Sequence, residues 1–489
     1  MARSLLEIAA VILLAAPSLE SREVYVDATV GNDATGNGSA AAPYRTLAHA
    51  LEAAAAGPLP ATFRLAAGRH DQALGERFPL TLPAGSHLEG AGGGKTIFSG
   101  SAGAVLLRAA PGVASSGPVV LRSLSFEKAR SALLIEAGPE ERCACAIEQV
   151  EITACEEGIV VGGDGEIELA LTASKLSGGA VGLRLIPTAS PSQPLTRHRV
   201  TASGCVFERH SSAGILREGP EGSLAATTPY RVTDCLFAEN EYGLHFTRPA
   251  GETPLEVRGC RFIGNRSVGA RLAGQRGDPV QHTLFEACSF ERNGTGLYLT
   301  NLEITNLVDR CAFSENVGNG LVAGCFAGRP GHTRVTNSLF AKNGASGLFA
   351  VSDGGLLAVR IVNCTFAANG TAGLFTKLRH GGRQEHGVQN SIFWTNGTDL
   401  LGLPPERVDK CLVQSETLAS DGRNIRSDPL FEDAAAGNYR LRAGSPAIDR
   451  GALPTSEPAL ATDLEGRPRI QDGDGDGTAC SDLGAYERM

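Results

Sequence analysis

Two carboxylates hold equivalent positions in neighbouring segments of the chain, where they could act together as an acid and a nucleophile. Glu286 and Asp309 each stand two residues ahead of a cysteine, Cys288 and Cys311. If these segments are adjacent parallel strands, the two carboxylates lie about 5 Å apart, close to the separation in retaining glycosidases. Two neighbouring carboxylates raise the pKa of one group and leave the other ionised. A retaining mechanism needs this difference, because one group is the acid and the other the nucleophile. The alternatives are a carboxylate ladder neutralised by Arg258, or a cation held between the strands.

Basic side chains occupy nearby positions in other segments, and together with the acid pair they form a stripe. Residues two, four and six places before each cysteine are expected to point outward from a strand. A stripe of arginine, histidine and carboxylate side chains suits the recognition of an acidic or hydroxyl-rich glycan. A solvated face with compensating charges is the alternative. The candidate ligand-binding residues are Arg231, Arg258, His282, His332, Arg334 and Arg360.

An aspartate-rich segment near the C-terminus is the best candidate for a metal site. Aspartate alternates with glycine in it, which copies the first half of a Ca²⁺ loop with its oxygen ligands at alternate positions. The last ligand position of such a loop would be Leu483 and not a glutamate, although Asp482 is adjacent. The alternative is an acidic turn that holds no ion. The predicted Ca²⁺ ligands are Asp472, Asp474, Asp476 and Asp482.

A repeated segment must position these side chains. Its clearest copy is CTFAANGTAGLF from Cys364, and copies begin at intervals of 23 to 30 residues between Cys205 and Ser391. The cysteine and the phenylalanine are two residues apart, so in a strand both point to the same face. An asparagine turn follows, and a Gly-Leu pair then begins another strand. The pattern therefore predicts that each unit consists of two short strands, an asparagine turn, a third strand and a variable loop.

Units of this kind bury a continuous apolar column only when they stack. Parallel stacking places equivalent residues about 4.8 Å apart, so that thiols, phenyl rings and asparagine amides form ladders. We therefore predict an all-β fold, a single-stranded right-handed parallel β-helix of about 10–13 coils. The helical pattern from Pro43 to Gly57 predicts an N-terminal helical cap over the first coil. Stacked thiols point in parallel, which favours buried free cysteines over disulfides.

Length, composition and charge restrict the classes of function. The chain has 489 residues and a formal net charge of −9, so neither nucleic acid nor an anionic membrane is an expected partner. The N-terminus, MARSLLEIAAVILLAAPSLES, predicts a signal peptide, because an apolar run follows a basic residue and precedes small residues. No later stretch reaches the roughly 18 apolar residues of a membrane span. We expect a monomer that is secreted, periplasmic or at the cell surface.

Segments at both ends of the chain resemble those of exported bacterial β-helix proteins of the pectate-lyase-like superfamily. The N-terminal segments are VYVDATVGNDATGNGSAAAPYRTLAHAL (24–51), GERFPLTLPAG (75–85) and LEGAGGG (88–94), and the C-terminal ones are GNYRLRAGSPAIDRG (437–451) and DLGAYE (482–487). The resemblance implies the same fold. It does not imply one activity, because the superfamily includes lyases, hydrolases, epimerases and non-enzymes. Its catalytic signatures, such as Gly-His-Gly or Trp-Ile-Asp-His, are missing from this sequence.

These observations predict four regions and two candidate functions. The regions are a signal peptide (1–21), an N-terminal cap with the first coils (22–100), the β-helix repeats (101–415) and a C-terminal module (416–489). The first function is that of an exported or cell-surface protein with a carbohydrate-binding or structural role, whose partner is a polysaccharide or cell-surface glycan. The alternative is a polysaccharide lyase or glycoside hydrolase that acts on the outer face of the β-helix.

Overall fold

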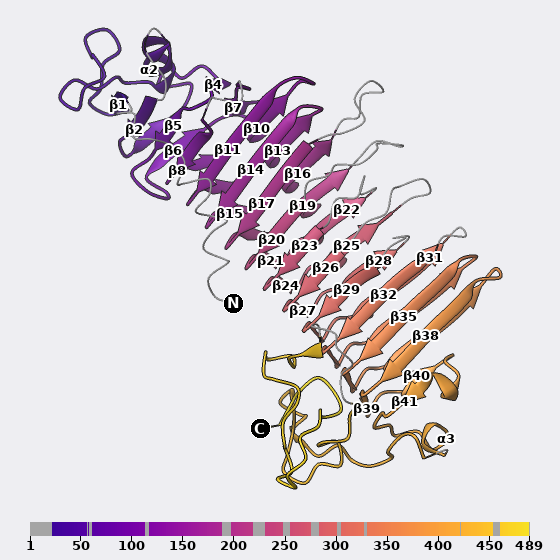
Figure 1. The fold of residues 1–489 in the computed structure, drawn as a ribbon. Helices are drawn as coiled ribbons and strands as arrows, with labels where there is room; N and C mark the ends of the chain where they lie inside the picture. Colours follow the sequence, from indigo (N-terminus) through magenta and orange to yellow (C-terminus); the bar gives the residue numbers. More distant parts are fainter. Residues whose placement is uncertain are drawn as a thin grey trace.

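The chain winds into one long column of β-coils, with a helix at the N-terminal end and the C-terminal segment folded back near the other end (Figure 1). The predicted signal peptide lies outside the described residues. No helix among the residues that the structure describes is long and apolar enough to cross a bilayer. The computed structural model describes residues 22–55, 57, 61–112, 117–187, 197–218, 230–247, 255–274, 283–300, 305–326, 330–420, 422–452 and 460–488.

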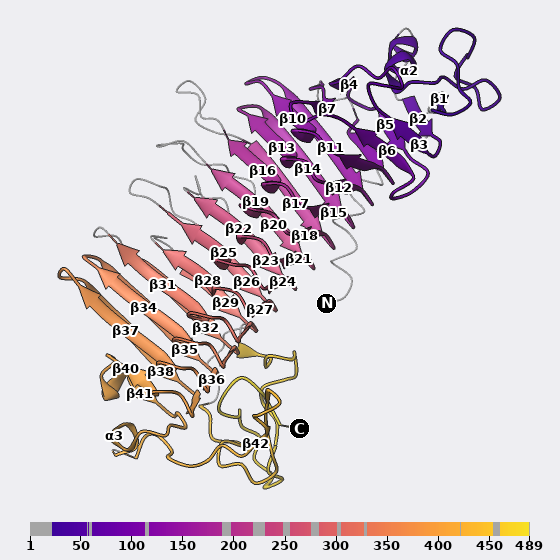
Figure 2. The ribbon, with the colours of Figure 1, turned by 180° about the vertical axis from the view of Figure 1, so that it is seen from behind.

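Three parallel sheets run along the column, and from β2 onward successive strands of the chain enter sheet 1, sheet 2 and sheet 3 in turn (Figures 1 and 2). Sheet 1 contains β1 (Arg22–Val26), β2 (Ala61–Leu65), β5 (His87–Glu89), β8 (Val119–Arg122), β11 (Arg142–Glu148), β14 (Glu166–Thr172), β17 (Arg197–Ser203), β20 (Tyr230–Thr233), β23 (Leu255–Arg258), β26 (Thr283–Glu286), β29 (Thr305–Asp309), β32 (Gly331–Thr336), β35 (Leu356–Val362), β38 (Arg383–Gln389) and β41 (Val408–Asp409). Sheet 2 contains β3 (Gly68–His70), β6 (Thr96–Ser99), β9 (Ser125–Glu127), β12 (Glu151–Thr153), β15 (Lys175–Ser177), β18 (Val206–Glu208), β21 (Leu236–Ala238), β24 (Arg261–Ile263), β27 (Ser289–Glu291), β30 (Ala312–Ser314), β33 (Leu339–Ala341), β36 (Thr365–Ala367) and β39 (Ile392–Trp394). Sheet 3 contains β4 (Leu80–Leu82), β7 (Val105–Ala109), β10 (Ser131–Ala137), β13 (Glu157–Gly163), β16 (Val181–Pro187), β19 (Ala213–Glu218), β22 (Tyr242–Thr247), β25 (Val268–Ala273), β28 (Thr295–Thr300), β31 (Leu321–Phe326), β34 (Leu348–Asp353), β37 (Leu374–Arg379) and β40 (Leu400–Leu401).

This arrangement confirms the predicted right-handed parallel β-helix. In the described part of the chain the three sheets have fifteen, thirteen and thirteen strands. Every pairing between the coils is parallel and joins equivalent positions, for example Phe237 with Phe262 and Phe262 with Phe290. Equivalent side chains therefore lie above one another, one strand spacing apart.

The phenylalanine ladder fills the centre of the column along sheet 2. Its rings stack nearly parallel from Phe207 to Phe393, with centroids 4.6 to 5.0 Å apart. The glycine of each Gly-Leu pair packs beside this stack, because a side chain there would collide with the next coil. At Gly296, a Cβ atom would lie 2.4 Å from the carbonyl oxygen of Gly320. The ring and the glycine recur together for this reason.

The asparagine ladder closes the turn between sheets 2 and 3. The side chain of Asn293 donates from Nδ2 to the carbonyl oxygen of Phe262 at 2.9 Å and to Oδ1 of Asn316 at 3.1 Å. Its own Oδ1 accepts from the backbone and side-chain nitrogens of Asn265, at 3.0 and 2.8 Å. The amide is fully buried, so these bonds replace water for the polar groups of three successive coils.

The cysteine ladder consists of free thiols. All twelve cysteines are unpaired, and eleven of them are buried. Burial raises the pKa of Cys143 to about 11 and that of Cys364 to about 12. The ladder thiols contact backbone carbonyls, as at Cys288, whose Sγ lies 3.3 Å from the carbonyl oxygen of Glu286. They act as small apolar side chains with weak donors.

Both ends of the column are covered. At the N-terminal end, α2 (Leu47–Ala54) packs Leu47 and Ala50 into the core, and the buried Glu76 accepts hydrogen bonds from its first amides at 2.7 and 2.9 Å. This helix is the predicted cap, although it is shorter than the sequence pattern. At the other end, a short 3-10 helix (Pro405–Arg407) precedes α3 (Glu416–Ala419), whose Leu418 joins the core.

The C-terminal module folds back against the outer face of sheet 2. It includes an antiparallel pair, β42 (Phe431–Asp433) and β43 (Asn438–Leu441). Tyr439 and Ile448 of the module form one apolar cluster with Leu339, Ala367 and Ile392 of three successive sheet 2 strands. The module therefore covers the last coils of sheet 2 on the outside of the β-helix.

Removing one amide from the asparagine ladder should destabilise the column. Asn293→Ala leaves several buried groups of Asn265 and Phe262 without partners, and we expect a loss of about 3 kcal/mol or more at about 1–3 kcal/mol for each group. Urea unfolding followed by circular dichroism measures the loss. The control, Arg292→Gln, changes an exposed residue of the same turn and should stay within about 0.5 kcal/mol of the unchanged protein. Equal effects of the two variants would contradict a structural role for the ladder.

Candidate functional site

The predicted stripe follows the outer face of sheet 1 in three rows of register partners. One row contains Arg258, Glu286 and Asp309 in successive strands. A second contains Arg231 with Glu256 and, further along the sheet, Arg334 with Arg360. His332 lies in a third row. The structure thus brings the candidates onto one face, except for His282, which lies outside the described residues.

Opposite charges alternate along much of this face. Arg64 contacts Glu23 at 2.7 Å and Glu89 at 2.6 Å, and Arg122 contacts Glu148 at 2.8 Å. In the predicted stripe, Nε of Arg231 lies 3.3 Å from Glu256. These pairs are partly exposed, and each contributes little to stability. They correspond to the compensated sheet face that was the alternative to a binding stripe.

Glu286 and Asp309 are neighbours in register, and every oxygen of the two carboxylates has a partner. Arg258 and Arg310 each bind one oxygen of Glu286. Arg310 also approaches Oδ2 of Asp309 at 3.2 Å, so one guanidinium bridges the two carboxylates. Oδ1 of Asp309 accepts from Oγ1 of Thr336 at 2.6 Å and from Nδ2 of Asn337 at 2.9 Å. The side chains are only 20% and 9% exposed, so both carboxylates are held in fixed and largely enclosed positions.

The hydrogen bonds of this acid pair continue into the C-terminal module. Asn337, which binds Asp309, accepts from Nε of Arg469 at 3.1 Å. Arg469 is fully buried and also contacts Glu487 at 3.3 Å and the carbonyl oxygen of Ala485 at 3.1 Å. The acid pair is therefore one end of a polar network that attaches the module to sheet 1.

Sequence reasoning missed Arg310 and Arg469, the two basic partners of this network. Arg310 follows β29 with a φ of 52°, outside the strand, so the alternation of inward and outward residues assigns it to no face. Its place immediately before Cys311 was the available signal, because that position recurs at each corner between sheets 1 and 2. Arg469 comes from the module, which has no repeat to predict its position.

Buried carboxyl groups surround Arg469. Burial, together with the neighbouring Asp482, raises the pKa of Glu487 to about 9. Burial also raises the pKa of Asp482 to about 6. Asp482 accepts hydrogen bonds from the backbone nitrogens of Asp449 and Arg488, at 2.8 and 2.7 Å. These groups hold the module together from within.

The aspartate-rich loop forms a carboxylate cluster that differs in part from the predicted set. Asp472 and Asp474 lie together, and Asp449 joins them, with one carboxylate oxygen from each within 4.8 Å of the others. Asp476 is not in this group, and Asp482 points into the buried network. Carboxylate oxygens are ligands that Ca²⁺ prefers, and this group offers three of them. Sequence reasoning missed Asp449 because it comes from a separate segment, SPAIDRG.

The basic end of the stripe differs from the rest of sheet 1. Arg334 and Arg360 are register partners, so two positive charges are stacked, whereas most charged neighbours on this face are opposite in sign. Arg360 is exposed and makes no ion pair with the described residues. His332 lies beside them and is partly exposed. We call Arg334, Arg360 and His332 the basic patch.

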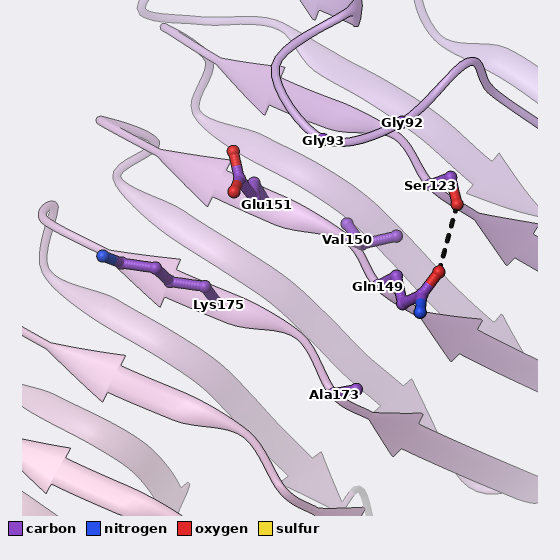
Figure 3. Close-up of a pocket in the computed structure, with 8 residues that line it drawn as sticks. All are labelled: Gly92, Gly93, Ser123, Gln149, Val150, Glu151, Ala173 and Lys175. Atoms are coloured by element: carbon purple, nitrogen blue, oxygen red, sulfur yellow. Dashed lines mark hydrogen bonds between the residues drawn. The ribbon is translucent and has the colours of Figure 1, made fainter.

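A shallow depression of about 280 Å³ lies at the corner between sheets 1 and 2 in the N-terminal half (Figure 3). Glu151 and Lys175 point outward along one side of it, and Ser123 donates to Gln149 at 3.3 Å along the other. Its two charged side chains are opposite in sign and belong to paired strands. This depression brings together no candidate from the stripe or from the aspartate cluster.

One family model matches a segment of the chain, and several solved structures align with most of it at low sequence identity. A model of a family described as proteins of unknown function, DUF1565, matches residues 29–135. No curated protein matches the chain. Among solved structures, pectate lyase Pel9A is 16% identical, with 96% of this chain and 97% of that chain covered and a TM-score of 0.40. The A-module of the Azotobacter vinelandii mannuronan C-5 epimerase AlgE6 is 14% identical, with 79% and 95% covered and a TM-score of 0.43. A mannuronic acid specific polysaccharide family 6 lyase from human gut microbiota is 14% identical, with 70% and 86% covered and a TM-score of 0.44.

Proposed function

We propose that this β-helix protein binds an acidic glycan without cleaving it, and that the basic patch on sheet 1 is the binding surface. One observation supports this proposal: Arg334 and Arg360 are stacked in register. Their register places two guanidinium groups side by side, and Arg360 is exposed and makes no ion pair with the described residues. Planar guanidinium groups bind carboxylates with paired, charge-assisted hydrogen bonds. The predicted signal peptide would export the protein, so it would meet such a glycan outside the cytoplasm.

A polysaccharide-cleaving activity is the second candidate, and the register of Glu286 with Asp309 favours it. A lyase or glycosidase needs a carboxyl group that meets its substrate. The two carboxylates are instead engaged by Arg258, Arg310 and Thr336, so substrate would have to displace these partners. We therefore favour binding over catalysis.

The binding proposal predicts that Arg360→Gln weakens the affinity for polyuronate oligosaccharides about tenfold, because one charge-assisted interaction is lost. Isothermal titration at low and high salt measures the affinity, which should fall as salt rises. Arg292→Gln, which removes a charge far from the patch, is the matched control and should bind normally. Unchanged affinity in Arg360→Gln would refute the assignment of the patch.

The enzyme candidate has its own test on the same protein preparations. Reducing ends and unsaturated products are measured with polyuronate and neutral polysaccharides, for the unchanged protein and for Glu286→Gln and Asp309→Asn. We expect no turnover. Turnover that both variants abolish would establish the alternative and overturn a purely binding role.

We also propose that Asp449, Asp472 and Asp474 hold a Ca²⁺ ion, whereas the predicted ligands Asp476 and Asp482 lie outside this group. Added Ca²⁺ should then release or absorb heat in a titration and raise the melting temperature, because a ligand of the folded state stabilises it. Asp472→Asn and Asp474→Asn should remove both effects. Asp428→Asn, an exposed residue of the same module, should remove neither. No heat and no thermal shift in the unchanged protein would leave a plain acidic turn.

A further inference from the structure

The outer face of sheet 3 carries a row of apolar and aromatic side chains in five successive coils. We call this row the aromatic column. Its three aromatic rings are partly exposed, Leu401 is 41% exposed, and Val322 is enclosed between its neighbours. Phe349 and Phe375 are in contact, with ring centroids 5.0 Å apart and planes tilted by 46°. The members are Tyr298, Val322, Phe349, Phe375 and Leu401, in strands β28, β31, β34, β37 and β40.

Among the described residues the outer face of sheet 1 carries no such aromatic row, and most of its charged neighbours are opposite in sign. The aromatic column is also separate from the face that the C-terminal module covers, because the module packs on sheet 2. The strands that carry the column lie side by side along the outside of the coils (Figure 2). Exposed aromatic side chains in a continuous row indicate a binding surface.

A cation marks one end of the aromatic column. Arg271 is the register partner of Tyr298, and its guanidinium carbon lies 5.7 Å from the centroid of the tyrosine ring. It donates to Nε2 of His245 at 2.8 Å. Burial, together with the positive charge of Arg271, lowers the pKa of His245 to about 4, so the imidazole is neutral at pH 7 and can accept this hydrogen bond. Arg271 makes no ion pair with a described carboxylate, and its positive charge is not compensated there.

The narrow width of the aromatic column favours a linear ligand over a protein partner. It is one side chain wide, and the adjoining row of Thr300, Gly324, Val351 and Lys377 is mostly small or polar. A stable protein interface needs about 800 Å² on each partner, which a row of this width does not provide. A linear polysaccharide is narrow, and its sugar units repeat at a length comparable to one strand spacing, about 4.8 Å. The apolar C–H faces of its rings can stack on successive aromatic side chains.

We propose that the aromatic column binds a linear, carboxylate-bearing polysaccharide that lies parallel to the axis of the β-helix. The rings of Tyr298, Phe349 and Phe375 stack against sugar faces, Arg271 binds a carboxylate at one end, and Lys377 binds another beside Phe375. The positive charges of Arg271 and the exposed Lys377 complement such a chain. This surface is distinct from the basic patch on sheet 1, and neither depends on the other.

The test uses full-length protein and oligogalacturonates long enough to span the column, each compared with its methyl ester, which keeps the ring and removes the charge. Phe349→Ala and Phe375→Ala should each weaken binding of both ligands about tenfold. Arg271→Gln should weaken binding of the acidic form only. Phe375→Tyr, which keeps the ring, should bind as the unchanged protein does, and melting curves check that each variant is folded.

Several results would overturn the proposal. These are unchanged affinity in both phenylalanine variants, absence of binding by the unchanged protein, or self-association in sedimentation experiments that Phe375→Ala abolishes. The last result would assign the column to contact with a second copy. Arg360→Gln distinguishes the two glycan surfaces, because it should weaken binding at the basic patch and leave stacking on sheet 3 intact.

Discussion

Hydrogen bonding between successive parallel coils is the constraint on which the rest of this molecule depends. It places equivalent residues of successive coils one strand spacing apart. A residue type that recurs in every coil therefore forms a ladder along the column. A phenyl ring must stack on another ring, a buried amide must meet another amide, and a glycine must face a backbone oxygen. Each coil buries its core only against its neighbours, so the stability of the column is a sum over adjacent pairs.

The same periodicity explains how much of the structure could be predicted from the sequence. The stacking of Phe237 on Phe262, the turn at Asn293 and the pairing of Glu286 with Asp309 follow from spacing alone, because coil-to-coil register transmits the pattern. Residues outside the repeat could not be placed in this way. Arg469 and Asp449 reach their partners through the fold of the C-terminal module, and no periodic signal in the sequence reports that fold.

The three outer faces of the column differ because only the inner faces are constrained by packing. Sheet 1 alternates charge along much of its length and carries the stacked arginines Arg334 and Arg360 toward its C-terminal end. Sheet 2 is covered by the C-terminal module over its last coils. On sheet 3, Phe349 and Phe375 are partly exposed and do not belong to the apolar cluster of the module among the described residues. Substitutions on an outer face can therefore change what the protein binds while the fold stays the same.

The unbridged cysteines set a further property of the molecule. Secreted domains commonly depend on disulfides, which form only under oxidising conditions. Here the thiols stabilise the column by filling space, as at Cys260 and Cys288, and no covalent link needs to be made or reshuffled. With all twelve cysteines free, a reducing environment has no cross-link to remove from the folded column.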